Sequence, residues 1–144
     1  MKVRIRRLHP DAVLPEYAHG ADEDAGLDVR ALHDFVIPAR GADAVPTGLS
    51  IELPGGYEAQ VRPRSGLTLK ARVVANFGTI DPGYRGEIRV VMLNLADEDY
   101  AIQKGDRIAQ IVIARYEAIE WDESPADREN ETQRGSRGFG SSGL

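Results

Sequence analysis

Short apolar segments with a period of two, separated by turn residues, restrict the fold of this chain more than any other feature of its sequence. Apolar and polar side chains alternate or form brief apolar blocks, and glycine or proline interrupts them roughly every dozen residues. The expected strands lie within residues 2–8, 34–53, 57–64, 72–95 and 105–121. Only residues 65–72 have the pattern of a short helix. Many short strands around one core are typical of an all-β sandwich or jelly roll.

The composition excludes several classes of protein. The 144 residues suit one domain, and the absence of cysteine excludes disulfides, a thiol nucleophile and a thiolate metal site. A formal net charge of −5 argues against binding of long nucleic acids. No apolar run has the length of a secretory signal core or a membrane span. We therefore expect a cytoplasmic protein whose partners include neither a membrane nor a nucleic-acid polymer.

Five polar clusters interrupt or follow the expected strands, and several of them combine arginine with glycine. They are "AGLDVRA", "PRSGLTLK", "GTIDPGYRGEIR", "GDRIAQ" and "RGSRGFGSSG". The second cluster has the parts of a phosphate site, because Arg64 supplies charge, Ser65 a hydroxyl and Gly66 an accessible backbone. Ser65 is also a suitable N-cap for the short helix, so both interpretations stay open.

The third cluster places Asp81 before Pro82 and Gly83. This sequence is typical of a turn between the two strands of a hairpin. A carboxylate at such a turn is also able to orient a water molecule, and the residues alone do not choose between these roles. Asp28 and the "GDRIAQ" cluster are ambiguous in the same way, since a buried aspartate or an ordinary Gly-Asp turn has the same sequence.

The remaining motifs carry less chemistry. His9, His19 and His33 have no metal-ligand spacing, and we interpret them as surface residues. Neither a P-loop nor a dinucleotide fingerprint is present. From residue 124 the apolar pattern stops, and the glycine-, serine- and arginine-rich end carries one ring, Phe139. We expect a domain at residues 1–123 followed by a mobile arm at 124–144.

Taken together and in order, the five clusters resemble the five motifs of the trimeric dUTP pyrophosphatases (dUTPases). The resemblance runs from about Asp24 to Gly143. It implies a distorted β jelly roll, a homotrimer with active sites shared between subunits, and a C-terminal arm that closes over a neighbour's bound dUTP. It also implies hydrolysis of dUTP to dUMP and pyrophosphate, which limits uracil in DNA and supplies dUMP for dTMP synthesis.

The resemblance also implies a role for each residue of the site. Asp81 would orient a water molecule for attack on the α-phosphorus, and Gln110 would contact that water or the phosphates. Asp28 would reach Mg²⁺ through a coordinated water, and Tyr84 would pack under the deoxyribose. The substrate-binding residues implied are Arg64, Ser65, Gly66, Asn76, Gly78, Thr79, Ile80, Tyr84, Arg89, Arg134, Phe139, Gly140, Ser141 and Ser142.

Two departures from the family pattern and two alternative functions accompany this interpretation. The segment between the "RSG" and "TID" motifs is shorter than in many members of the family, which leaves the implied contact of Asn76 with uracil open. In the C-terminal cluster, Arg137 stands where glycine is common. The related dCTP deaminases need a glutamate where this chain has Val91, which argues against that activity. A catalytically silent nucleotide-binding protein is the other alternative, and the presence of Asp81 together with the complete arm favours an enzyme instead.

Overall fold

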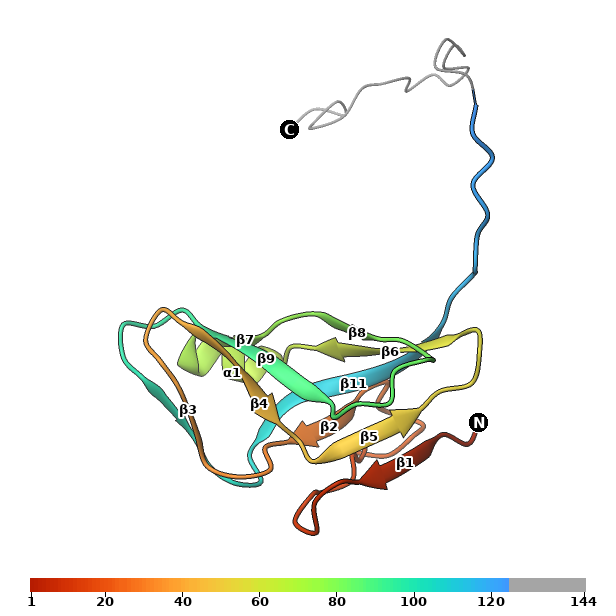
Figure 1. Ribbon diagram of the computed structural model, residues 1–144. Helices are drawn as coiled ribbons and strands as arrows, with labels where there is room; N and C mark the ends of the chain where they lie inside the picture. The colour runs from red at the N-terminus through yellow and green to blue at the C-terminus, as the bar shows by residue number, and fades with distance from the viewer. Residues whose placement is uncertain (125–144) are drawn as a thin grey trace.

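The computed structural model describes residues 1–124, which form a β-rich body with one short helix (Figure 1). All strand pairs are antiparallel. In chain order the elements are β1 (Arg4–Arg7), β2 (Leu27–Arg30), β3 (Phe35–Ile37), β4 (Ala42–Pro46), β5 (Leu49–Glu52), β6 (Tyr57–Arg62), α1 (Ser65–Ala71), β7 (Val73–Ala75), β8 (Gly78–Ile80), β9 (Arg89–Asn94), β10 (Tyr100–Ile102) and β11 (Arg107–Arg115). The predicted all-β class with one short helix is confirmed.

The strands form two larger sheets and two strand pairs. One sheet has the order β2-β11-β6-β8 and the other has the order β4-β9-β7, while β1 pairs with β5 and β10 with β3. Neighbours in these sheets are mostly distant in the chain; β11, for example, lies between β2 and β6. The alternating sequence pattern therefore identifies the strands, whereas tertiary packing selects their partners.

Inward-facing aliphatic side chains of the strands form one continuous core. In β9 the burial alternates, so that Val90 and Met92 are buried while Arg89 and Val91 face outward. Asn94 is also buried, and its side chain donates to the carbonyls of Ile37 and Glu98 and accepts from the Ala96 N–H. Because these polar atoms have partners, the core closes around them without an unpaired amide.

The hairpin predicted at Asp81 is wrong. The strands on either side of this turn do not pair with each other, because β8 pairs with β6 whereas β9 pairs with β4 and β7. The turn itself forms, since the Tyr84 N–H donates to the Asp81 carbonyl at 3.1 Å. The loop then carries the chain from one sheet to another, which the local sequence does not reveal.

The predicted helix is present, but Ser65 is not its N-cap. Arg64 occupies that position with extended angles (φ −101°, ψ 122°), and no side chain caps the helix. The helix ends at Ala71, and the following C-cap residue, Arg72, has a left-handed conformation (φ 56°) and donates its N–H to the Thr68 carbonyl. Ser65 is therefore the first helical residue, with its side chain exposed beside Arg64.

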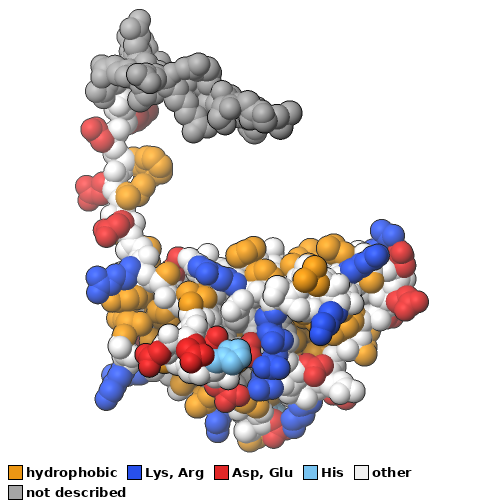
Figure 2. All heavy atoms as spheres, turned by 180° about the vertical axis from the view of Figure 1, so that it is seen from behind, with side chains coloured by type: hydrophobic (Ala, Val, Ile, Leu, Met, Phe, Trp, Pro, Cys, Tyr) orange, Lys and Arg blue, Asp and Glu red, His pale blue; other side chains and the backbone are white. Residues whose placement is uncertain are grey.

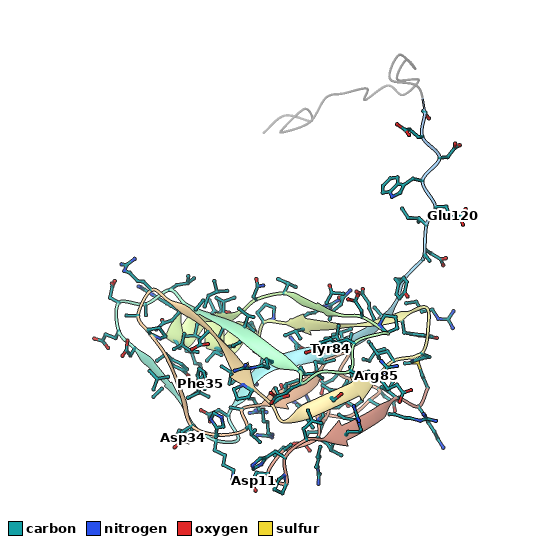
Figure 3. The ribbon with its side chains drawn as sticks, viewed as in Figure 1. Asp11, Asp34, Phe35, Tyr84, Arg85 and Glu120 are labelled. Carbon is teal, nitrogen blue, oxygen red and sulfur yellow. The ribbon has the colours of Figure 1, made fainter. Side chains whose placement is uncertain are left out.

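The last strand is shorter than predicted. It ends at Arg115, opposite Tyr57, because its partner β6 begins there. Residues 116–124 continue without strand pairing and rise away from the body, with Glu120 labelled on this segment in Figure 3. Ile119 and Trp121 on this segment are exposed, Trp121 by 89%. Within residues 1–124, no helix is long and apolar enough to span a membrane.

Candidate active site

A polar pocket of about 470 Å³ gathers residues from three of the five sequence clusters. The clusters meet because β11 pairs with both β2 and β6, which places Gln110 opposite Asp28 on one side and Arg62 on the other. Helix α1 begins shortly after β6. The pocket is lined by Ala18, His19, Asp24, Gly26, Asp28, Arg64, Ser65, Gly66, Arg107 and Gln110.

Asp28 is at the centre of the charged groups in this pocket. Its side chain is 12% exposed and binds the Arg64 Nε at 3.0 Å through one oxygen and an Arg107 terminal nitrogen at 3.2 Å through the other. Arg64 also donates to the Arg107 carbonyl at 3.0 Å. One carboxylate thus holds two guanidinium groups at the pocket wall, in the geometry of charge-assisted hydrogen bonds.

Gln110 has a fixed position in the same pocket. Its Nε2 donates to the Pro63 carbonyl at 3.0 Å. Gly26 lies against its other amide atom, since a Cβ built on Gly26 would be 2.2 Å from Oε1 of Gln110. A side chain at position 26 would therefore displace the amide, so Gly26 is required for the observed position of Gln110.

His19 and Asp24 form a part of the pocket wall that the sequence prediction did not include. The Asp24 carboxylate accepts from the His19 backbone N–H at 2.6 Å and contacts the Nδ1 of the same residue at 3.2 Å. These hydrogen bonds lower the pKa of Asp24 below its ordinary value, and the bond from the His19 backbone N–H makes the larger contribution. The His19 side chain is 71% exposed, as predicted, but it is paired and lines a pocket.

A second, smaller pocket of about 240 Å³ contains the third cluster. It is lined by Val61, Gly78, Thr79, Ile80, Asp81, Tyr84, Glu87, Ile88 and Arg89. Asp81 is exposed at its edge, and Tyr84 donates its hydroxyl hydrogen to the Glu87 carbonyl at 2.8 Å. Figure 3 shows Tyr84 and Arg85 on the loop between β8 and β9. This pocket combines apolar side chains with two acidic residues, Asp81 and Glu87, and with Arg89.

The structure thus divides the predicted site residues between two pockets that share no lining residue. Asn76 lines neither of them: its N–H bonds the Val91 carbonyl, and its amide bonds the Phe77 carbonyl. The arm residues Arg134, Phe139, Gly140, Ser141 and Ser142 lie outside the described residues. The predicted site is therefore divided within one chain.

The charge of the polar pocket is nearly balanced. Asp24 and Asp28 supply two carboxylates, and Arg64 and Arg107 supply two guanidinium groups. Basic, acidic and histidine side chains gather together on one face of the body in Figure 2. Arg107 was not among the predicted site residues, although it belongs to the "GDRIAQ" cluster, three residues before Gln110. This pocket offers hydrogen-bond donors to a polyanion but cannot neutralise one alone.

Comparisons of the sequence with known proteins give one consistent result. The sequence model of the dUTPase family matches residues 14–143. Deoxyuridine 5'-triphosphate nucleotidohydrolase from Solibacter usitatus is 57% identical over 146 residues, covering 99% of this chain and 97% of the relative. Enzymes of the same name from Rickettsia conorii and Gloeothece citriformis are 49% and 47% identical, covering 99% and 100% of this chain and 97% and 98% of their own lengths.

Solved structures agree with the sequence comparison. The dUTPase of Staphylococcus bacteriophage 80alpha with dUpNHpp superimposes with a TM-score of 0.89 at 27% identity, covering 99% of both chains. A mutant dUTPase from phage phi11 of S. aureus, described with a structural Mg(II) ion, has the same fold at 24% identity (TM-score 0.82, covering 88% of this chain and 99% of that one). This chain therefore belongs to the dUTPase family, as the match to the family model, the sequence identity over the whole length and the shared fold together show.

Proposed function

We propose that the protein hydrolyses dUTP to dUMP and pyrophosphate, and so limits uracil in DNA while supplying dUMP for dTMP synthesis. The observation that carries this proposal is the pair of pockets with complementary chemistry. One presents arginine, serine and amide donors suited to phosphate oxygens, and the other combines apolar walls with Asp81 and Tyr84. The phage 80alpha relative was solved with dUpNHpp, a ligand of the same class.

In the proposed reaction, Asp81 orients a water molecule and accepts its proton as the water oxygen bonds to the α-phosphorus. The bond between that phosphorus and the oxygen bridging to the β-phosphorus breaks, and pyrophosphate leaves with the bond electrons. An exposed carboxylate is a weak base, so correct positioning and neutralisation of phosphate charge supply most of the acceleration. Gln110, fixed by Pro63, contacts the phosphates or the attacking water.

The position of β8 supports recognition of uracil by the main chain. β8 pairs with β6 along one edge and is the last strand of its sheet among the described residues. The backbone groups of Gly78, Thr79 and Ile80 that face away from β6 are available to a ligand. A site built to bond the uracil pattern disfavours cytosine, because cytosine leaves buried partners unpaired.

The polar pocket fits a magnesium ion that arrives with the phosphates. Within residues 1–124, no group of three or more histidine, cysteine or acidic residues is arranged to hold a metal. Asp28, whose carboxylate is already bonded by two arginines, suits a contact through a water of the ion. When bound, Mg²⁺ would supply the positive charge that the balanced pocket lacks.

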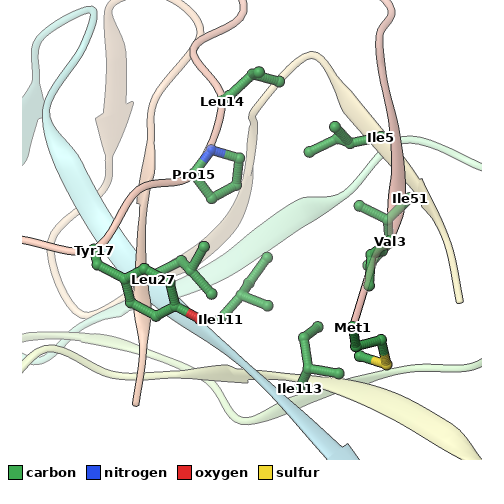
Figure 4. A pocket seen from close by; sticks show the side chains of 10 residues that line it. All are labelled: Met1, Val3, Ile5, Leu14, Pro15, Tyr17, Leu27, Ile51, Ile111 and Ile113. Atoms are coloured by element: carbon green, nitrogen blue, oxygen red, sulfur yellow. The ribbon is translucent and has the colours of Figure 1, made fainter. Parts of the chain in front are cut away.

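The division of the site between two pockets supports a homotrimer in which different chains complete each site. The exposed apolar side chains of residues 116–124 are also typical of a segment that is covered in an assembly. One chain presents an apolar groove lined by Ile5 of β1, by Val3 just before that strand, and by Ile111 and Ile113 of β11 (Figure 4). The arm at 124–144 would then close over a neighbouring site with Arg134 and Phe139.

Asp81→Asn tests the proposed reaction. The substitution keeps the size of the side chain but removes the base, so turnover of dUTP should fall by about a thousandfold or more while affinity for dUpNHpp stays within a fewfold. Turnover is measured as pyrophosphate release, and affinity is measured by calorimetry. Preserved turnover in this variant would remove Asp81 from the reaction.

A further inference from the structure

Gly86 lies directly beneath the ring of Tyr84. A Cβ built on Gly86 would be 2.5 Å from the Tyr84 hydroxyl oxygen, 2.7 Å from Cζ and 3.0 Å from Cε2. Ordinary side-chain contacts begin near 3.4 Å, so the phenol ring occupies the space of the missing side chain. Any residue other than glycine at this position would force the ring to move.

The backbone of Gly86 gives no other reason for a glycine. The glycines with a left-handed φ in the described chain are Gly20, Gly48, Gly56 and Gly105. Gly86 is not among them, so its φ lies outside the left-handed region that favours glycine. Glycine is therefore required at position 86 because the Tyr84 ring occupies the space that a side chain there would fill.

The acceptor of the Tyr84 hydroxyl is held in place from both sides. Ser50, which is buried, donates its hydroxyl hydrogen to the Arg85 carbonyl at 2.9 Å, and the Ile88 N–H donates to the Leu49 carbonyl at 2.7 Å. The Glu87 carboxylate itself accepts from the Gly48 N–H at 2.8 Å. The Glu87 carbonyl therefore lies in a backbone segment fixed to β5 and the residue before it, and it fixes the end of the ring.

We propose that Gly86 is a specificity-determining residue: the space above it allows Tyr84 to lie across the loop and bond Glu87, and this fixed ring excludes a ribose 2'-hydroxyl. The inference rests on the proposed function, in which Tyr84 packs under the deoxyribose. Tyr84 is 45% exposed and lines the pocket that contains Asp81, so a substrate meets the ring on its open side. A ring that is held in one position discriminates against the 2'-hydroxyl of a ribose more strongly than a mobile ring does.

The test compares Gly86→Ala with a matched control in the same loop, Gly83→Ala. A Cβ on Gly83 meets nothing within 4 Å, and its φ is also outside the left-handed region. For each protein, kcat/KM is measured with dUTP and with UTP. We expect the dUTP/UTP ratio to fall by about tenfold or more in Gly86→Ala and to stay within about twofold of wild type in Gly83→Ala. A ratio that Gly86→Ala leaves unchanged would overturn the proposal.

A second pair of variants separates the steric effect from a general loss of folding. Tyr84→Ala removes the ring, so adding Gly86→Ala to it should change neither the ratio nor the melting temperature appreciably. A further tenfold change in that background would show that Gly86 acts on something other than the ring, and would refute the inference. If Gly86→Ala alone unfolds, the double variant should fold as well as Tyr84→Ala does.

The same experiments distinguish this inference from the proposed function. A wild-type protein that releases no pyrophosphate from dUTP would refute the reaction. In that case the ratio of the Kd values for dUpNHpp and its ribose counterpart, measured by calorimetry, still tests Gly86. Wild type should bind the deoxy analogue more tightly, and Gly86→Ala should reduce that preference by about tenfold. Equal preference in both proteins would contradict the proposed role of Gly86.

Discussion

Mixing two inactive variants tests whether one active site uses residues of different chains. Asp81→Asn removes the proposed base from the smaller pocket, and Arg64→Ala removes a cation from the polar pocket. Neither variant alone should hydrolyse dUTP at an appreciable rate. In a random one-to-one assembly, a shared site receives an intact Asp81 in half of the cases and, independently, an intact Arg64 in half. The mixture should therefore recover about one quarter of wild-type activity.

The assay is pyrophosphate release after the two variants are co-expressed with different tags and the mixed assemblies are purified. A mixture of wild type with Asp81→Asn is the control and should retain about half of the activity. If both pockets of one site came from the same chain, each chain of the mixture would carry a defective site. Activity that stays at the level of the single variants would then refute the shared site, provided that the control retains its half.

Three further predictions concern single elements of the site. Gly26→Ala should lower kcat by about tenfold because its Cβ displaces the Gln110 amide, whereas Gly55→Ala, which meets nothing within 4 Å, should match wild type in the same assay. Asp28→Asn should raise the magnesium concentration for half-maximal turnover severalfold, measured by titration with MgCl₂; an unchanged requirement would separate Asp28 from the metal. Truncation after Ser124 should leave the melting temperature within a few degrees of wild type and reduce dUTP turnover by about a hundredfold. Full activity of the truncated protein would exclude a role for the arm.

The sequence predicts the strands because burial on one face produces alternation, as in β9 with Val90 and Met92 inward. It does not predict that β8 and β9 belong to different sheets, since pairing depends on contacts between residues far apart in the chain. The true end of β11 at Arg115 is likewise set by where its partner β6 begins. Local pattern thus determines strands, and tertiary structure determines their pairing and length.

The site shows the same division between local and tertiary information. The sequence marks Asp28, Arg64 and Gln110 as members of separate polar clusters, and the pairing of β11 with β2 and β6 places them in one pocket. Gly26 lacks a Cβ where the Gln110 amide lies, and Asp28 pairs with Arg107. Both contacts join residues far apart in the chain, so no single segment of the sequence encodes them. The sequence predicts a surface position for His19 but does not reveal that Asp24, five residues later, binds it.

The proposed hydrolysis is best tested by pyrophosphate release from dUTP in the presence of magnesium, measured beside release from dCTP, dTTP and UTP. Ammonia is assayed in the dCTP reaction as a control for deamination. We expect rapid release from dUTP, with far slower release from the other three nucleotides and no ammonia. Ammonia from dCTP would indicate a deaminase despite Val91. If dUTP released no pyrophosphate under conditions where dUpNHpp binds, the protein would bind the nucleotide without hydrolysing it, which would contradict the proposed function.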